Sequence, residues 1–355
     1  MRKSEYAGKT QTVLGWIDGI DLGVTLPHEH LVCDVSSVYA EPSNATDKDM
    51  AHKPVNLETL NWLKYHPLES IDNLQLLDEQ EAIDEAMLFK KAGGNTIVDQ
   101  TNIGIGRDPK ALARISRATG LNIIMGSGYY VGPSHPSNMA TKTEEDITEE
   151  IVQDITSGVE NTGIRAGIIG EIGCMWPLWE NEKKVLRAAA RAQHLTGAPL
   201  NIHLGRKREA AIEIIEILEK AGSDLSHTVM SHVDIRIHDH AERCKVAKKG
   251  CYLEYDVFGW EGQFPLSHYW EPDLFYQPND TRRIYEIMQL IDEGYIKQIL
   301  ISHDVCLKTW RACRGGKGYI HILNDIVPRM LKAGMTQEQI DTIMIENPQR
   351  MLCFV

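Results

Sequence analysis

The sequence predicts an α/β fold, a (β/α)8 TIM barrel formed by a single domain spanning residues 1–355. Short, continuously apolar runs recur along the chain, and each is followed by a stretch with helical periodicity. Continuous apolarity is typical of strands buried on both faces, as in a parallel sheet. Eight such units over about 300 residues match the size of one closed barrel. An open, doubly wound sheet is the alternative that this pattern leaves open.

The expected strands are followed by amphipathic helices. The strands are the opening segment ending at Pro27-His28 and residues 96–100, 121–125, 166–170, 200–203, 228–232, 252–256 and 299–303. Residues 209–221 carry Ile and Leu at the spacing of a helix face. Residues 181–197 form a second predicted helix, because Gly197 and Pro199 are typical of a helix end.

Two segments, residues 32–65 and 258–279, are long for loops between a strand and a helix. Long loops within compact domains usually serve a function. Loops that follow strands lie at the catalytic end of a barrel. We therefore expect both segments to shape a substrate pocket. The second is rich in aromatic residues, namely Trp260, Phe264, Tyr269, Trp270, Phe275 and Tyr276.

Composition excludes several classes of partner. The net charge of −13 argues against nucleic acid, which needs clustered Lys and Arg to neutralise phosphates. A small anion remains possible, since a local pocket can oppose the global charge. The seven cysteines form no CxxC pair, and no apolar run is long enough for a signal peptide or a membrane span. These features predict free thiols, no membrane partner and a cytoplasmic location.

Side chains of the kinds that bind metals fall at the carboxyl ends of five predicted strands. They are His28 and His30 on the first strand, then Glu171, His203, His232 and Asp304 on the fourth, fifth, sixth and eighth. A His-x-His pair alone is a weak signal, and a lone histidine is more often a packed or surface residue. The carboxyl ends of barrel strands, however, converge on one mouth. Six such residues at that mouth predict a metal site.

The motifs around these residues are HEH, GEIG, IHLGR, MSHVD and ISHD, in this order. They resemble the phosphotriesterase family of the amidohydrolase superfamily, whose members are metallo-dependent hydrolases. Residues 11–15, 167–174, 250–256 and 345–348 resemble the phosphotriesterase-related subgroup more closely. The resemblance covers nearly the whole chain.

The resemblance implies a role for each candidate ligand. His28, His30 and Asp304 would bind the more buried of two divalent ions, His203 and His232 the more exposed ion, and Glu171 would bridge the two. The founding phosphotriesterases bridge their ions with a carboxylated lysine. Because Glu171 takes that place here, phosphotriester hydrolysis is expected only as a side activity.

Imidazole and carboxylate ligands suit Zn²⁺, with Mn²⁺, Co²⁺ or Fe²⁺ as alternatives. Two such ions, roughly 3.5–4 Å apart, hold a hydroxide between them and lower its pKa towards neutrality. That hydroxide is expected to attack a carbonyl or phosphoryl centre. Asp304 is the expected catalytic residue, taking the proton and passing it to the leaving group.

Cations near the predicted mouth indicate an anionic substrate, because guanidinium and ammonium groups pair with carboxylate, sulfonate or phosphate. Arg206 follows His203 by three residues, and Lys308, Arg311 and Arg314 follow the eighth strand. Ordinary solvated loop cations are the alternative interpretation.

At least one of Tyr129 and Tyr130, which follow the third strand, is expected to face the pocket and hydrogen-bond the substrate. The alternative is a ring packed under the loop.

The predicted function is hydrolysis of an amide or ester bond in a small, anionic metabolite, with an N-acyl amine such as N-acetyltaurine as the analogy that the resemblance supplies. A lactonase acting on a sugar lactone or a phosphorylated lactone is the second prediction. A protein that binds a vanilloid such as resiniferatoxin without catalysis is the third, from another class. The resemblance also implies a homodimer.

Overall fold

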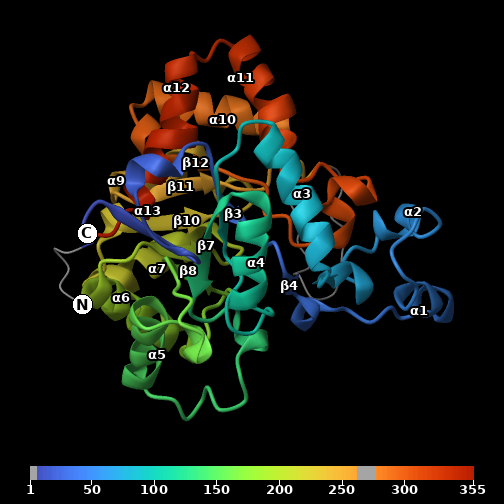
Figure 1. The fold of residues 1–355 in the computed structure, drawn as a ribbon, viewed down its shortest axis with the longest axis horizontal. Coiled ribbons are helices and arrows are strands. Elements are labelled where there is room, and N and C mark those ends of the chain that lie inside the picture. Colours follow the sequence, from blue (N-terminus) through green and yellow to red (C-terminus); the bar gives the residue numbers. More distant parts are fainter. Residues whose placement is uncertain (1–5, 262–276) are drawn as a thin grey trace.

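A barrel of parallel strands forms the centre of the computed structural model, which describes residues 6–261 and 277–355 (Figure 1). Within these residues, eight strands pair in the order β12-β11-β10-β9-β8-β7-β6-β3. They are β3 (Thr25–Glu29), β6 (Thr96–Asp99), β7 (Asn122–Ser127), β8 (Ile168–Gly173), β9 (Leu200–His203), β10 (Thr228–Ser231), β11 (Tyr252–Tyr255) and β12 (Ile299–Ile301).

Hydrogen bonds bring the end of the last strand back to the first. The His28 N–H donates to Ser302 Oγ at 3.1 Å, and the Asp304 N–H donates to the His28 carbonyl at 3.2 Å. Because β12 lies beside β3, the open doubly wound alternative is wrong. The predicted (β/α)8 barrel is confirmed.

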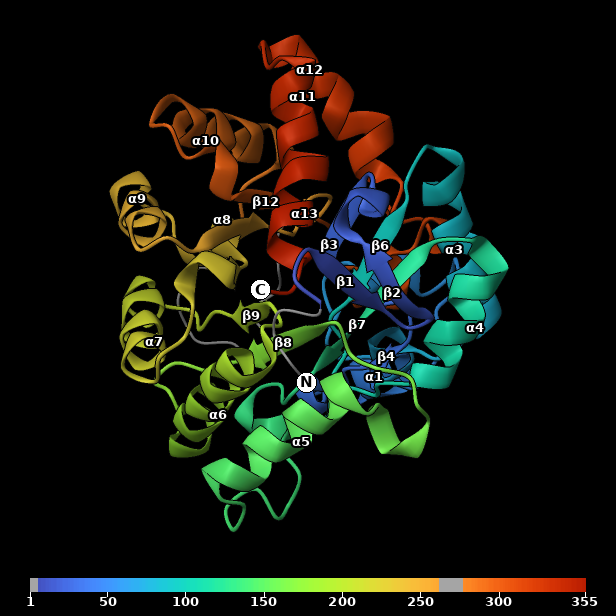
Figure 2. The ribbon, with the colours of Figure 1, turned by 60° about the vertical axis from the view of Figure 1, so that its left-hand side comes forward.

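Helices form a ring around the strands (Figure 2). They are α3 (Glu79–Lys91), α4 (Pro109–Thr119), α5 (Glu144–Thr156), α6 (Glu180–Thr196), α7 (Arg208–Lys220), α8 (Val233–Arg236), α9 (His240–Lys248), α10 (Asp280–Asp292), α11 (Val327–Ala333), α12 (Gln337–Asp341) and α13 (Asn347–Leu352). The two helices predicted from periodicity are α6 and α7. Helix α6 ends at Gly197, whose φ of 74° is a left-handed conformation that glycine adopts without strain.

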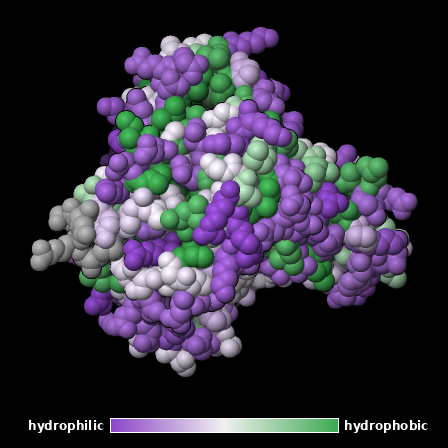
Figure 3. Space-filling model, viewed as in Figure 1, coloured by the Kyte–Doolittle hydropathy of each residue, from purple (hydrophilic) through white to green (hydrophobic). Residues whose placement is uncertain are grey.

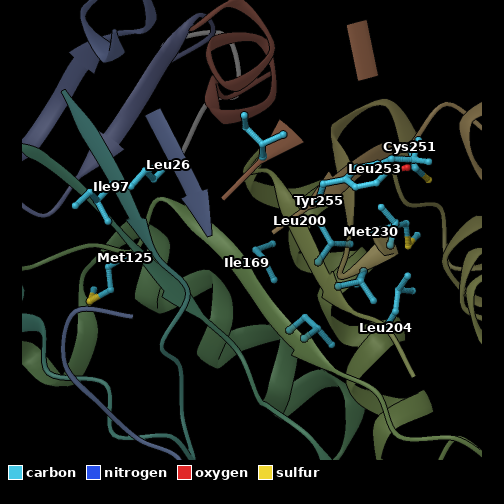
Figure 4. Packing of buried hydrophobic residues seen from close by; sticks show 14 of the residues in the cluster. Leu26, Ile97, Met125, Ile169, Leu200, Leu204, Met230, Cys251, Leu253 and Tyr255 are labelled. Atoms are coloured by element: carbon cyan, nitrogen blue, oxygen red, sulfur yellow. The ribbon is translucent and has the colours of Figure 1, made fainter. Parts of the chain in front are cut away.

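Alternation along each strand divides its side chains between two apolar layers. Ile97, Ile169 and Met230 belong to the large cluster that joins the strands to the surrounding helices (Figure 4). A separate cluster at the amino end of the barrel takes the neighbouring residues of the same strands. It consists of Leu22, Val98, Ile124, Ile168, Val229, Tyr252, Leu300, Met351 and Leu352.

The amino end of the barrel is also covered by the chain termini. Strands β1 (Lys9–Thr12) and β2 (Gly15–Asp18) form an antiparallel hairpin. In the turn of this hairpin, the Val13 N–H donates to the Ile123 carbonyl at 2.9 Å. At the other terminus, the Phe354 N–H donates to the Lys9 carbonyl at 2.9 Å. With this end covered, the carboxyl ends of the strands are left for a functional site.

The chain between β3 and α3, which includes the predicted long segment 32–65, extends from the barrel on the right of Figure 1. It contains α1 (Ala45–Ala51), α2 (Leu60–Leu63) and a short antiparallel pair, β4 (Cys33–Asp34) with β5 (Gln75–Leu76). The second long segment is described only at its ends. Its residues Phe264, Tyr269, Trp270, Phe275 and Tyr276 lie outside the described residues.

The surface and the thiols agree with the composition. Hydrophilic residues cover most of the face seen in Figure 3, with hydrophobic residues interspersed. All seven cysteines are free, as predicted. Among the described residues, no helix combines the length and the apolarity needed to cross a bilayer.

Candidate metal centre

The first two predicted ligands, His28 and His30, lie at the carboxyl end of β3 with ring centroids 5.8 Å apart. His28 Nδ1 is 3.2 Å from both Glu254 Oε2 and Asp256 Oδ2, which leaves Nε2 as the nitrogen that faces Glu171. That Nε2 is buried and has no hydrogen-bond partner in the described part of the chain. A buried imidazole nitrogen in this state is a suitable donor to a transition-metal ion.

His30 is also held through its Nδ1, which leaves its Nε2 facing the other candidate ligands. Its Nδ1 lies 2.9 Å from Thr101 Oγ1, and its Nε2 lies 3.2 Å from Asp304 Oδ1. Asp304 follows β12 by three residues and has a φ of 50°. Strand alternation does not set its direction. The left-handed turn does, and it directs the Asp304 carboxylate to the histidines of the first strand.

Glu171, on β8, lies between two groups of histidines. Its Oε1 is 3.5 Å from His30 Nε2. Its Oε2 is 2.9 Å from His203 Nδ1, 3.4 Å from His232 Nε2 and 3.5 Å from His28 Nε2. The two oxygens thus face different histidines, which is the arrangement that a bridging carboxylate requires.

His203 and His232 form the second histidine pair. His203 Nδ1 and His232 Nε2 lie 2.8 Å apart and both face Glu171. Asp256 fixes the orientation of His232, since its Oδ1 lies 2.8 Å from His232 Nδ1. His232 comes directly after β10 with a φ of 60°, again a left-handed position. Asp256 therefore contacts one histidine of each pair, His28 and His232.

The pKa values show how strongly these groups act on one another. Burial and the charge of His232 lower the pKa of His203 to about 3. Burial also acts to lower the pKa values of His30 and His232, but acidic partners outweigh it. Asp304 and Glu171 raise the pKa of His30 to about 10, and Asp256 and Glu171 raise that of His232 to about 9. The pKa of Glu171 is held well below its usual range by the surrounding histidines, although burial opposes this.

The structure brings the six predicted ligands together. It forms groups of three that include His28, His30 and Glu171, and Glu171, His203 and His232, whose ligand atoms lie within 4.8 Å of one another. The donor set and the unpartnered Nε2 of His28 fit divalent transition-metal ions.

Sequence reasoning missed the residues that orient the histidines. Glu254 and Asp256 are fully buried on and just after β11 and contact the Nδ1 atoms of His28 and His232. Their spacing was a usable signal. Two carboxylates two residues apart at the end of an apolar strand point the same way, as His28 and His30 do. Thr101 gives no such signal, because a threonine after a strand is common.

A cavity extends outward from these histidines. Its lining includes His203, His232, Asp304, Tyr130, Arg206 and Arg236. Both long segments contribute to it, as predicted, through Val35 and Val38 after β3 and through Trp260 after β11. Arg206 and Tyr130 therefore lie where the sequence places them. The Tyr130 ring packs against His203 with centroids 4.9 Å apart.

The structure corrects the placement of two predicted substrate-binding residues. The Tyr129 hydroxyl points away from the cavity and donates to Glu150 on α5. The Lys308 ammonium lies 2.5 Å from Asp72 Oδ1 and does not line the cavity. Neighbouring side chains along an extended chain point in opposite directions, so only one of two consecutive tyrosines faces inward.

The other loop cations are also paired elsewhere. Arg311 and Arg314, which follow β12, both contact Glu81 on α3, at 3.2 Å and 2.7 Å. Arg236, on α8, is the charged residue of the cavity lining that sequence reasoning missed. An arginine in a short helical stretch looks like a surface residue in sequence.

Four imidazoles and two carboxylates converge at the carboxyl end of this (β/α)8 barrel, an arrangement of the metal-dependent barrel hydrolases. The phosphotriesterase family model matches residues 8–352, and the chain belongs to this family. N-acetyltaurine hydrolase of Xenopus tropicalis is 46% identical over 352 residues, which cover 99% of each chain. The protein is thus a hydrolase, and the resemblance seen in its motifs is confirmed.

Solved structures agree with this family. A resiniferatoxin-binding protein from Rhodobacter sphaeroides has a TM-score of 0.92 and 37% identity, covering 97% of this chain and 95% of that one. A lactonase from Listeria monocytogenes has a TM-score of 0.76 and 27% identity, covering 98% and 99%.

Proposed function

We propose that the protein is a dinuclear metal-dependent hydrolase that cleaves the amide bond of a small, anionic N-acyl amine, with N-acetyltaurine as the nearest example. The position of Glu171 carries the proposal. Its Oε1 faces His30 and its Oε2 faces His203, His232 and His28, so the carboxylate lies within reach of the ligands of both ions. The 46% identity to N-acetyltaurine hydrolase of Xenopus tropicalis supports this substrate class.

The ligands divide between two ions. His28, His30 and Asp304 would hold one ion, and His203 and His232 the other, with Glu171 shared. Zn²⁺ suits this mixture of imidazole and carboxylate donors best. Bound divalent cations would activate water and polarise the carbonyl of the substrate.

Asp304 is the proposed proton carrier. Its side chain is 8% exposed and lines the cavity, while its Oδ1 faces His30. Burial raises the pKa of Asp304, which suits a group that accepts a proton from the attacking water and passes it to the departing amine.

The cavity suits a small substrate with one charged end. Val35, Val38 and Leu68 form an apolar part of its lining that would accommodate a short acyl group. Arg206 and Arg236 supply positive charge on the same cavity, against a chain whose net charge is −13.

Lactone hydrolysis is the second candidate, supported by the likeness to the lactonase from Listeria monocytogenes. The same residues would serve, because a lactone also presents a carbonyl to the activated water. Binding of a vanilloid, suggested by the resiniferatoxin-binding protein, would use the apolar part of the cavity.

Turnover and metal content test the proposal together. The protein is prepared with excess Zn²⁺, Mn²⁺ or Co²⁺, its metal is counted by elemental analysis, and hydrolysis is measured for N-acetyltaurine, N-acetyl amino acids, sugar lactones and a phosphotriester. We expect two ions per chain and the highest kcat/KM for an anionic N-acyl amine. Highest kcat/KM for a lactone would replace the amide proposal by lactonase activity. Absence of stoichiometric metal would remove the dinuclear centre.

A further inference from the structure

Arg236 differs from the other buried arginines of the described residues because it makes no ion pair. The others are paired as Arg243 with Glu286 at 3.2 Å, Arg283 with Asp234 at 2.7 Å and Arg311 with Glu81 at 3.2 Å. Arg236 is only 5% exposed. A buried cation without an ion-pair partner loses several kcal/mol of hydration, and Asp256, Asp234 and Asp304 act on Arg236 only from beyond ion-pair distance. A structural arginine would be expected to have a carboxylate beside it, as the other three have.

The contacts of Arg236 leave part of its guanidinium available. Its Nε donates to the Leu204 carbonyl at 3.1 Å, which fixes the side chain beside the strand end that carries His203. Its Nη1 is buried and has no hydrogen-bond partner among the described residues. The side chain also lines the cavity together with His203 and His232. An oriented donor without an ion-pair partner therefore lies beside the candidate metal centre.

We propose that Arg236 is a specificity-determining residue that binds the anionic group of the substrate. The inference rests on the proposed amide hydrolysis and narrows it to N-acyl amines whose amine part carries a sulfonate or a carboxylate. A guanidinium matches both groups, since its planar fork donates two parallel hydrogen bonds. The charged end of the substrate lies at Arg236, and the uncharged acyl end packs against the apolar lining around Val35, Val38 and Leu68.

Arg206 has a smaller part in this recognition. It lines the same cavity but is half-buried, so solvent screens its charge more strongly. Replacing it should weaken binding of the anion less than replacing Arg236 does. The order of the two effects is itself part of the inference.

The test compares an anionic substrate with its uncharged isostere in the metal-loaded, full-length protein. The pair is N-acetyltaurine and the same molecule with a methyl sulfone in place of the sulfonate. For Arg236→Met, we expect kcat/KM for N-acetyltaurine to fall by about 30-fold or more, mainly through KM, because a buried charge pair is lost. The sulfone should change by less than about threefold. Arg236→Lys should recover part of the loss for the sulfonate.

Two controls separate substrate binding from a structural role. Arg187→Met, at an exposed position of α6 where Arg187 pairs with Glu144 on α5, should leave kcat/KM for both substrates unchanged. The melting temperature of Arg236→Met should equal or exceed that of the unsubstituted protein, since the change removes an unpaired buried charge. Equal loss for both substrates, or no loss for either, overturns the assignment of Arg236. So does a larger loss for Arg206→Met than for Arg236→Met.

A binding measurement separates this inference from the proposed function. The probe is 4-oxopentane-1-sulfonate, which replaces the amide nitrogen of N-acetyltaurine by carbon and resists hydrolysis. Calorimetry should show that Arg236→Met weakens its binding by about 30-fold, as expected for loss of a buried charge pair. Arg236-dependent binding without amide cleavage would overturn the proposed hydrolysis and keep the anion site. Binding that does not depend on Arg236, together with amide cleavage, would overturn the anion site and keep the proposed hydrolysis.

Discussion

The two ends of the barrel are built from the same strands but contain opposite chemistry. At the amino end, Ile168, Val229, Tyr252 and Leu300 form part of an apolar cluster. At the carboxyl end, the same strands or their continuations carry histidines and carboxylates within a few ångströms of one another. Burial is nearly complete at both ends. The comparison shows that depth of burial does not distinguish a core from a site, whereas the polarity of the inward side chains does.

The backbone differs between the two ends as well. Among described residues other than glycine, four have positive φ, and two of these are the candidate ligands His232 and Asp304. A left-handed conformation costs such residues of order 1 kcal/mol. The apolar cluster takes its strand residues from regular β-structure. The apolar cluster thus stabilises the fold at the amino end. At the carboxyl end, left-handed conformations cost part of that stability and direct the candidate ligands towards one another.

The largest expected effect comes from removing the shared charge at the carboxyl end. Glu171→Gln keeps the size of the side chain but removes the carboxylate that lies between His30 and the pair His203 and His232. We expect kcat/KM for the best substrate to fall by about 10³-fold or more, because several kcal/mol of transition-state stabilisation depend on the ions. At least one ion should be lost, which elemental analysis measures.

The fold should survive that change. Far-ultraviolet circular dichroism of Glu171→Gln should match that of the unsubstituted protein, since the apolar clusters are unaffected. Two ions and near-normal turnover in Glu171→Gln would contradict the bridging role.

At the amino end, we expect a substitution to lower stability and to leave turnover nearly unchanged. Ile168→Ala should lower the free energy of unfolding by roughly 2–5 kcal/mol, because it leaves a cavity in the apolar cluster. Chemical denaturation measures this. Below the unfolding transition, kcat should change by less than about twofold, since Ile168 is three residues before Glu171 on β8 and contributes to another layer. Ile168→Val serves as the milder control, with an expected loss of about 0.5–1.5 kcal/mol. A large fall in kcat without loss of stability would show that the two ends are not independent.

These two ends were not equally open to prediction from sequence. The eight strands and the six candidate ligands follow from apolar runs that end in metal-binding side chains, and chain order alone places these at one mouth. Contacts between distant residues do not follow in this way. Lys308 forms an ion pair with Asp72, which is 236 positions away in the chain. No local pattern indicates that pairing.

Orientation was the second limit. Tyr129 and Tyr130 are equivalent in sequence, but only Tyr130 lines the cavity. Arg236 is the last residue of α8, which begins directly after the left-handed residue His232. The direction of its side chain therefore depends on backbone angles that the sequence does not reveal. Side-chain direction after a strand ends is therefore harder to predict than the strand itself.

A smaller effect is expected from the carboxylate that orients the histidines. Asp256→Asn keeps the shape of the residue but removes its negative charge. The amide has only one oxygen, so it cannot accept a hydrogen bond from both His28 Nδ1 and His232 Nδ1 in the way that the two carboxylate oxygens can. Metal affinity should fall by about 10–100-fold, as is usual for loss of a partner behind a ligating histidine. Competition with a chelator measures the affinity. Added metal should restore turnover in this variant, whereas it should not in Glu171→Gln. Unchanged affinity would mean that Asp256 only fills space.

The smallest expected effect is a release of protons on metal binding. In the metal-free protein, pKa values of about 10 for His30 and about 9 for His232 mean that both rings hold an extra proton at pH 7. A metal ion needs the unprotonated nitrogen, so binding must displace these protons. Titration calorimetry in two buffers of different ionisation enthalpy should count at least one proton released per chain. Ile168→Ala should release the same number, because the amino end contains no titrating group of this kind.

The sign of the pH dependence follows from the raised pKa values. A histidine whose pKa is higher in the folded protein than its usual 6.5 stabilises the metal-free fold below that value, and this stabilisation is lost as pH rises through 9 to 10. Metal affinity changes in the opposite direction, rising with pH until the same groups have lost their protons. The metal-free and metal-loaded proteins should therefore differ least in melting temperature under acidic conditions and most near pH 9. A constant difference between pH 6 and pH 9 would show that His30 and His232 do not lie where the ions bind.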